Sequence, residues 1–158
     1  MLFRSHTRDA VSTPFRLLDM GVPPFMVATS LQAVIAQRLV RLNCDTCSEP
    51  HEPSAQEAAW LLAMAQPGET IVPRRGRGCS ACNGTGYVGR QGVYELLEMD
   101  LGLTAAATRG DLTAFMQMGR ERMQGQGIAN HALDLVRSGR TSVAEALRVG
   151  QDFDGPGA

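Results

Sequence analysis

The sequence predicts a mixed α+β chain, mostly helical, with three consecutive modules at residues 1–42, 43–98 and 99–158. Apolar residues recur at three- and four-residue spacing in the first and last modules, which is typical of helices that bury one face. A strand-like pattern begins at Val93 in the middle module. That module also holds all four cysteines of the chain among turn-forming residues, which indicates a small body organised around a metal ion.

The first module is expected to form two helices. Thr13 is a candidate N-cap for a short helix, with Pro14 in its first turn and Gly21 just past its end. A longer helix is expected to run from Pro23-Pro24 to Leu42, with one apolar face formed by Ala28, Leu31, Ile35, Leu39 and Leu42. These residues encode no sheet for that face to pack on, so it is expected to be partly exposed.

The middle module carries one helix signal and one strand signal. Ser54 and Glu57 form a capping-box pattern, which predicts a helix from about Ala55 to Met64. Residues 76–92 are rich in glycine and are expected to form loops or tight turns. The strand follows at residues 93–99.

The third module is expected to be helical. Asp111 is a candidate cap for a helix that reaches about Met123. An apolar stripe between residues 128 and 136 is closed by Gly139 and predicts a second helix. Ser142 and Glu145 form another capping box, which starts the last helix, and residues 152–158 are expected to form a frayed tail.

Composition excludes several classes of protein. The net charge of −1 is too balanced for a nucleic-acid binder, and the longest apolar stretch is interrupted by arginine and glutamine, which disfavours membrane insertion. The chain contains no lysine, whereas a P-loop needs a lysine that reaches the nucleotide phosphates, so a complete P-loop nucleotidase is excluded. No export signal is apparent, which predicts a cytoplasmic location.

The strongest chemical signal is a pair of Cys-x-x-Cys motifs, formed by Cys44 with Cys47 and by Cys79 with Cys82. Two such turns facing each other supply four sulfurs to one ion, which is the closed tetrahedral arrangement of structural zinc. A closed site has no open position for water, so a structural role is expected and not a catalytic one. The alternatives are two solvated turns with reduced cysteines and a redox-active pair.

Other basic side chains are weaker signals. Four arginines flank the cysteine pairs and are expected to offset thiolate charge rather than to bind phosphate or RNA: Arg41, Arg74, Arg75 and Arg77. His6 lies close to Asp9 and is a candidate catalytic residue, although a histidine near an N-terminus is usually a surface residue.

Six blocks of the chain carry a resemblance to a known family. They are residues 5–10, 16–25, 36–41, 78–87, 92–97 and 139–149. Together they closely resemble the GspE/PilB ATPases, which drive type II secretion and type IV pilus assembly, and the resemblance covers about residues 2–150. Met123-Gln124-Gly125 and the final helices look most like the ATPase of the mannose-sensitive haemagglutinin (MSHA) pilus system.

The resemblance implies a place for each module in a hexameric motor. Residues 1–42 would be the tail of a RecA-like α/β core, followed by a tetracysteine zinc module and a C-terminal helical domain. His6 matches the family's histidine box, which is implied to contact the nucleotide phosphate, although Arg4 and Ser5 depart from the family's pattern. Gln37 and Arg38 match a Gln-Arg pair that packs between core and zinc module. The family's Walker A loop, Walker B acids and arginine fingers lie upstream of this segment, so ATP and Mg²⁺ are expected only if another chain supplies that core.

Three functions are consistent with these observations. The first is the zinc-binding and assembly part of a type II secretion or type IV pilus ATPase, unable to bind or hydrolyse ATP alone. It would contact other motor subunits and the inner-membrane platform protein at the cytoplasmic face. The second is a C-terminal half that completes an ATPase in trans with a separately encoded Walker-containing half. The third is a free-standing zinc ribbon, because Cys79 to Gly86 is similar to one unit of the DnaJ zinc domain.

Overall fold

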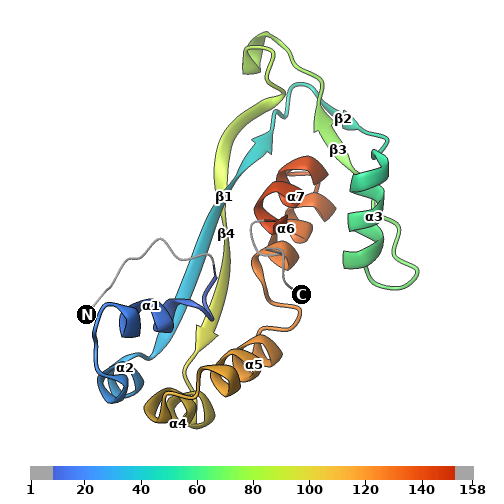
Figure 1. Ribbon diagram of the computed structural model, residues 1–158. Coiled ribbons are helices and arrows are strands. Elements are labelled where there is room, and N and C mark those ends of the chain that lie inside the picture. The colour runs from blue at the N-terminus through green and yellow to red at the C-terminus, as the bar shows by residue number, and fades with distance from the viewer. Residues whose placement is uncertain (1–8, 152–158) are drawn as a thin grey trace. The chain divides into compact units, whose positions relative to one another are not determined.

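The computed structural model describes residues 9–151, which form a mixture of helices and strands and confirm the α+β class (Figure 1). In chain order the elements are α1 (Thr13–Asp19), α2 (Pro24–Ser30), β1 (Ala33–Asn43), β2 (Ser48–Pro50), α3 (Ala55–Met64), β3 (Arg74–Gly76), the 3₁₀ turn η1 (Ser80–Cys82), β4 (Tyr87–Glu98), α4 (Leu101–Arg109), α5 (Leu112–Arg122), α6 (Ile128–Arg137) and α7 (Val143–Gln151). His6 and the predicted tail at residues 152–158 lie outside the described residues.

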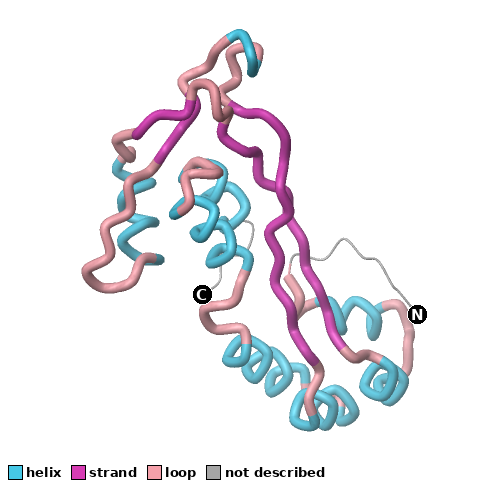
Figure 2. Tube along the Cα trace, turned by 180° about the vertical axis from the view of Figure 1, so that it is seen from behind, coloured by secondary structure: helices cyan, strands magenta, loops and turns pink. Residues whose placement is uncertain are grey.

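The strands form two separate two-stranded sheets. β1 pairs with β4, and these two long strands lie side by side (Figures 1 and 2). The arrows of Figure 1 show that they run in opposite directions. β2 pairs with β3 antiparallel, with Glu49 opposite Arg75. In both sheets a strand that precedes α3 pairs with a strand that follows it, so both depend on contacts between residues far apart in the sequence.

The prediction of one helix from Pro23 to Leu42 is wrong over most of its length. α2 ends at Ser30, Leu31 already has extended backbone with φ −81° and ψ 119°, and β1 then begins. Two residues of the predicted apolar face, Ile35 and Leu39, are 66% and 44% exposed on the strand.

The physical reason is that residues 33–43 carry a second pattern, of period two. The buried apolar residues of β1 are Val34, Ala36 and Val40. Because side chains of a strand alternate between its faces, these three lie on one face. Valine and isoleucine favour strands, and pairing with β4 supplies the backbone partners that a helix would have supplied internally.

The expected loop at residues 76–92 is also partly wrong. Gly76 closes β3, and β4 begins at Tyr87, six positions before the predicted strand start at Val93. The glycine-rich composition of this segment masks the strand. The helix α4 lies in the module that is expected to be helical.

Most helix ends follow the sequence signals. Ser54 and Glu57 form the predicted capping box at the start of α3, with bounds that match the prediction. Asp111 accepts a hydrogen bond from the backbone N–H of Ala114 and caps α5. At α1, Ser12 holds the N-cap position instead of Thr13, whose hydroxyl donates to the Asp9 carbonyl at 2.9 Å.

The chain forms two compact units, each assembled from two stretches of sequence. Unit 1 comprises Met1–Ala36 with Tyr94–Gly127, and unit 2 comprises Gln37–Val93 with Ile128–Ala158. The division into consecutive modules at 1–42, 43–98 and 99–158 stays a prediction about the sequence.

Unit 1 is held by helix packing and by one aromatic pair. α4 packs against both α2 and α5. Phe115 of α5 is fully buried and meets the ring of Phe15 edge-on, with 5.4 Å between the centroids. The buried carboxylate of Glu95 accepts a hydrogen bond of 2.6 Å from the backbone N–H of Ala10.

Unit 2 contains both cysteine pairs and the last two helices. α7 packs against α6 and against α3. The side chains of α6 and α7 that are buried most completely include Leu133, Val136, Val143 and Val149. Unit 2 thus combines an apolar helical core with a cysteine cluster that contains little other apolar surface.

Candidate metal centre

The structure brings the four cysteines together in unit 2. All four Sγ atoms lie within 4.8 Å of one another. The Sγ–Sγ distances are 3.9 Å for Cys44 with Cys79, 3.9 Å for Cys47 with Cys82, and 3.7 Å for Cys79 with Cys82. Cys79 is partly exposed and the other three are buried.

These distances fit a tetrahedral metal site. Sulfurs about 2.3 Å from a central zinc ion lie about 3.8 Å from one another when they occupy the corners of a tetrahedron. The sulfur pairs at 3.7–3.9 Å match that spacing. The donor set is all thiol, which suits zinc and excludes hard cations such as Mg²⁺ and Ca²⁺.

Both cysteine turns are shaped by backbone hydrogen bonds. In the first turn, the Cys47 N–H donates to the Cys44 carbonyl at 3.1 Å. In the second, the N–H groups of Cys79 and Gly86 each donate to the Cys82 Sγ at 3.2 Å. The Cys44 N–H donates to the Gly86 carbonyl at 2.9 Å and links the two turns. Donors aimed at sulfur are the environment that a thiolate requires.

The buried thiols differ in acidity because their hydrogen bonds differ. Burial raises the pKa of Cys47 to about 12. Burial acts on Cys82 in the same direction, but the N–H groups of Cys79 and Gly86 donate to its sulfur and bring its pKa down to about 6. A divalent cation bound by all four sulfurs would displace the remaining protons.

Two glycine pairs allow the backbone segments beside the cluster to approach closely. A Cβ atom added at Gly76 would lie 2.0 Å from the Gly86 carbonyl oxygen, and one added at Gly86 would lie 2.3 Å from the Gly76 oxygen. Gly78 also approaches Gly84 closely, with 2.6 Å between an added Cβ at Gly78 and the Gly84 oxygen, whereas a Cβ at Gly84 would meet no atom within 4 Å. Side chains are therefore excluded where β3 meets the second cysteine turn.

The flanking arginines are not all directed at the sulfurs. The Arg41 guanidinium donates to Glu145, and the Arg74 guanidinium donates to the Ser48 carbonyl at 2.6 Å. These two arginines thus have other hydrogen-bond partners, and the expectation that they offset thiolate charge stays a prediction. Arg75 and Arg77 are exposed.

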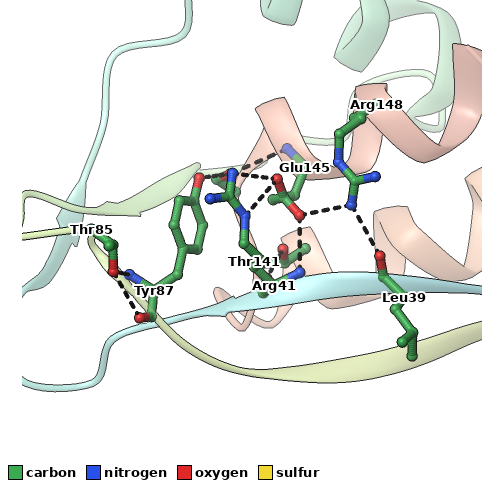
Figure 3. A network of polar contacts seen from close by, with 8 residues as sticks. Leu39, Arg41, Thr85, Tyr87, Thr141, Glu145 and Arg148 are labelled. Carbon is green, nitrogen blue, oxygen red and sulfur yellow. Dashed lines mark hydrogen bonds and ion pairs between the residues drawn. The ribbon is translucent and has the colours of Figure 1, made fainter. Parts of the chain in front are cut away.

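A polar network joins residues that flank the two cysteine pairs in sequence to residues of α7 (Figure 3). Glu145 is 2% exposed and accepts hydrogen bonds from Arg41 and Arg148. The Arg41 guanidinium lies over the ring of Tyr87, 4.2 Å from its centroid, and Tyr87 Oη hydrogen-bonds Ser142 Oγ at 2.7 Å. This network has no local signature in the sequence, where Glu145 is recognisable only as the acid of a capping box.

The other sequence-predicted residues lie elsewhere or outside the described part. His6 is among residues 1–8, which the structure does not describe. Gln37 and Arg38 lie on β1, where the Arg38 guanidinium donates to the Gln37 carbonyl at 3.0 Å.

None of the helices formed by residues 9–151 has the length and hydropathy that a bilayer-spanning helix requires.

Comparison with known proteins identifies relatives along nearly the whole chain. Residues 2–148 match the family described as "Type II/IV secretion system protein". The chain is 39% identical over 144 residues to the "Type II secretion system ATPase E" of Vibrio cholerae, covering 91% of this chain and 28% of the relative. It is 37% identical over 145 residues to the "Type II secretion system protein E" of Pseudomonas aeruginosa, with coverage of 91% and 28%. It is 33% identical over 144 residues to the "Type IV pilus assembly ATPase PilB" of Myxococcus xanthus, with coverage of 90% and 25%. The chain therefore spans about a quarter of the length of these relatives.

Proposed function

The chain belongs to the family of type II/IV secretion system proteins, and on this premise we propose that it is the zinc-binding assembly part of a type II secretion or type IV pilus ATPase. In this proposal the four cysteines hold one structural Zn²⁺, and the metal-held body supports contacts with other parts of the secretion machinery.

The sulfur geometry carries the metal part of the proposal. Pairs at 3.7–3.9 Å match a zinc tetrathiolate, and three of the four cysteines are buried. When bound, the ion cross-links two turns whose cysteines lie 35 positions apart, and a closed set of four ligands gives it no catalytic position. Such a cross-link stabilises a body whose cluster contains little apolar surface.

ATP hydrolysis is not expected of this chain alone. Two of the relatives are named as ATPases, but the chain spans only about a quarter of their length. It has no lysine to reach nucleotide phosphates. We therefore assign ATP and Mg²⁺ binding to a Walker-containing core that this chain does not include.

The sequence resemblance supports a more detailed proposal for the location of the protein and for its assembly. We place the protein at the cytoplasmic face of the inner membrane, in a hexameric motor. There it would contact neighbouring subunits and the platform protein. The block at 123–125 and the final helices favour an MSHA-like pilus system.

Elemental analysis tests the metal assignment. The purified chain should carry about one zinc per molecule, and Cys82→Ser should lose it. Ser80→Ala is the matched control, because Ser80 lies in the same turn and is exposed. A chain that binds no zinc, or a Cys82→Ser variant that retains a full equivalent, contradicts the assignment.

Nucleotide assays test the second part. The chain alone should neither bind a fluorescent ATP analogue nor release phosphate from ATP. Turnover by the chain alone contradicts the proposal. Turnover that appears only after a Walker-containing half is added favours completion of an ATPase in trans.

A further inference from the structure

Gly86, the residue before Tyr87, is hydrogen-bonded to both cysteine turns. Its N–H donates to the Cys82 Sγ at 3.2 Å, and its carbonyl accepts from the Cys44 N–H at 2.9 Å. One cysteine comes from each turn, so Gly86 is held on both sides by the elements that a metal would cross-link. Tyr87 comes next and is the first residue of β4.

Tyr87 connects this position to the polar network of α7 (Figure 3). Its hydroxyl hydrogen-bonds Ser142 Oγ at 2.7 Å, and its ring lies beneath the Arg41 guanidinium at 4.2 Å. The Thr85 hydroxyl donates to the Cys82 carbonyl at 2.7 Å and accepts from the Tyr87 N–H at 3.3 Å, so it links the Tyr87 backbone to the second cysteine turn. The tyrosine therefore has little freedom to move independently of the second cysteine turn.

The partners of Tyr87 are the residues that hold the start of α7. Ser142 Oγ accepts a hydrogen bond from the Glu145 N–H at 3.3 Å, as an N-cap does. Glu145 in turn accepts from Arg41, and the Thr141 hydroxyl donates to the Arg41 carbonyl at 2.7 Å. Thr141, Ser142 and Glu145 are each at most 2% exposed, so water does not readily replace these contacts.

We propose that metal binding by the four cysteines and docking of α7 in unit 2 are energetically coupled through Tyr87 and its contacts with Ser142 and Arg41. This inference rests on the proposed metal site and extends it. When the metal leaves, the two cysteine turns lose their cross-link, Gly86 loses its fixed neighbours, and Tyr87 no longer holds one position against α7. The coupling is reciprocal, so a docked α7 strengthens metal binding by the same factor.

The chain contains a natural probe of α7. Trp60 is its only tryptophan and lies on α3, which packs against α7. A Cβ atom added at Gly150 of α7 would lie 3.8 Å from Trp60 Nε1, so the indole is close to the α7 backbone. Loosening of α7 changes the solvent exposure of this indole and with it the emission of the protein.

The experiment compares the full chain with and without zinc, by Trp60 emission and by hydrogen exchange of the amides at residues 143–149. Zinc should slow this exchange about tenfold and shift the emission to shorter wavelength.

Tyr87→Phe keeps the ring under Arg41 and removes the hydroxyl. This variant should reduce the effect of zinc on exchange about fivefold, as expected for one hydrogen bond. The same variant should weaken zinc affinity, measured against a chromophoric chelator, by the same factor.

Two further variants keep the result interpretable. Ser142→Ala removes the same hydrogen bond from the α7 side together with the N-cap bond to the Glu145 N–H. It should therefore speed exchange of the α7 amides with and without zinc, and should reduce the ratio between the two conditions at least as much as Tyr87→Phe does. Tyr94→Phe removes the hydroxyl of the other tyrosine, which belongs to unit 1, and should leave the effect unchanged.

Each possible failure has its own signature. If the wild-type chain binds one zinc but its α7 exchange and Trp60 emission do not respond, the coupling is wrong and the metal site stands. If Tyr87→Phe and Ser142→Ala respond to zinc as the wild type does, the route through Tyr87 is wrong. If elemental analysis finds no bound zinc, the proposed metal site itself fails, and the coupling fails with it.

Discussion

Arg41 and Glu145 lie 104 positions apart in the chain and form one of the most completely bonded ion pairs of unit 2. The Arg41 Nε and Nη2 atoms donate to one carboxylate oxygen of Glu145 at 3.0 and 2.7 Å, and the Arg41 backbone N–H donates to the other at 2.9 Å. Arg148 adds a donor at 3.1 Å. Glu145 is 2% exposed, and both of its carboxylate oxygens accept hydrogen bonds from these donors. Removing the carboxylate therefore leaves several donors without an acceptor.

The first prediction concerns the stability that this carboxylate contributes. Glu145→Gln should lower the free energy of unfolding by about 2–4 kcal/mol, because an amide cannot accept at both of its heavy atoms and carries no charge. Urea unfolding followed by circular dichroism measures the change. Glu49→Gln is the control, since Glu49 is exposed on β2, and it should alter stability by less than about 0.5 kcal/mol. Equal stability for the two variants would show that the Arg41–Glu145 pair does not stabilise unit 2.

The second prediction is a pH dependence. Burial favours the neutral form of Glu145, but its bonds to Arg41 and Arg148 outweigh burial and lower its pKa from 4.5 to about 2. A lowered pKa means that the ionised carboxylate stabilises the fold above its unfolded pKa, and that this contribution of about 3 kcal/mol is lost as the pH falls from 4.5 towards 2.

The difference between wild type and Glu145→Gln isolates this group from other titrations. The difference in the free energy of unfolding should be largest at about pH 6 and should vanish near pH 2. Glu69, whose pKa is lowered to about 2 by Arg137, titrates in both proteins and cancels in the comparison. A difference that stays constant over this range would mean that Glu145 titrates normally in the folded protein.

The sequence predicted those parts of the fold that depend on local signals. α3 is set by the Ser54–Glu57 capping box, and α5 by the Asp111 cap, so both could be located without knowledge of the tertiary structure. The conformation of residues 31–43 could not be predicted in this way, because two patterns overlap there. Ile35 and Leu39 fit the spacing of a helix, whereas Val34, Ala36 and Val40 fit the alternation of a strand. The choice is made by pairing with β4, more than 40 positions later in the chain.

The candidate site also has parts that local signals predict and parts that they do not. The four cysteines were identified because each Cys-x-x-Cys pair is visible within four residues, and the structure brings the two pairs together. The partner of Arg41 has no local signal in the sequence, because Glu145 lies 104 positions away. The contact between Tyr87 and Ser142 spans 55 positions and has no local signature.

The third prediction concerns the close approach of backbones beside the cluster. Gly76→Ala would place a Cβ atom 2.0 Å from the Gly86 carbonyl oxygen, a backbone atom that cannot move aside without displacing the turn that carries Cys82. We expect zinc content to fall well below one equivalent and the thermal midpoint to drop by several degrees.

Gly68→Ala separates this steric effect from that of removing a glycine. Gly68 has a positive φ of 81° with open space around it, so alanine there costs about 1 kcal/mol through backbone strain alone and should leave zinc content unchanged. Full zinc occupancy in Gly76→Ala would contradict the close approach of β3 to the second cysteine turn.

The fourth prediction concerns the core of unit 1. Phe115 is fully buried and meets Phe15 edge-on, so Phe115→Ala removes both a large apolar side chain and an aromatic contact. The variant should lose about 3–5 kcal/mol of stability, and its α5 amides should exchange faster with solvent. Phe25→Ala is the control, because Phe25 is 59% exposed and its removal should have little effect.

A double-mutant cycle isolates the aromatic contact from the loss of buried area. Phe15→Leu and Phe115→Leu keep apolar bulk while removing the rings, and the pair should couple by about 0.5–1.5 kcal/mol, as edge-to-face rings do. Because the centroids are 5.4 Å apart with an interplanar angle of 78°, each ring directs an edge or a face at the other, and either substitution alone should abolish the whole interaction. Strictly additive effects of the two substitutions would show that the rings contribute only through the area they bury.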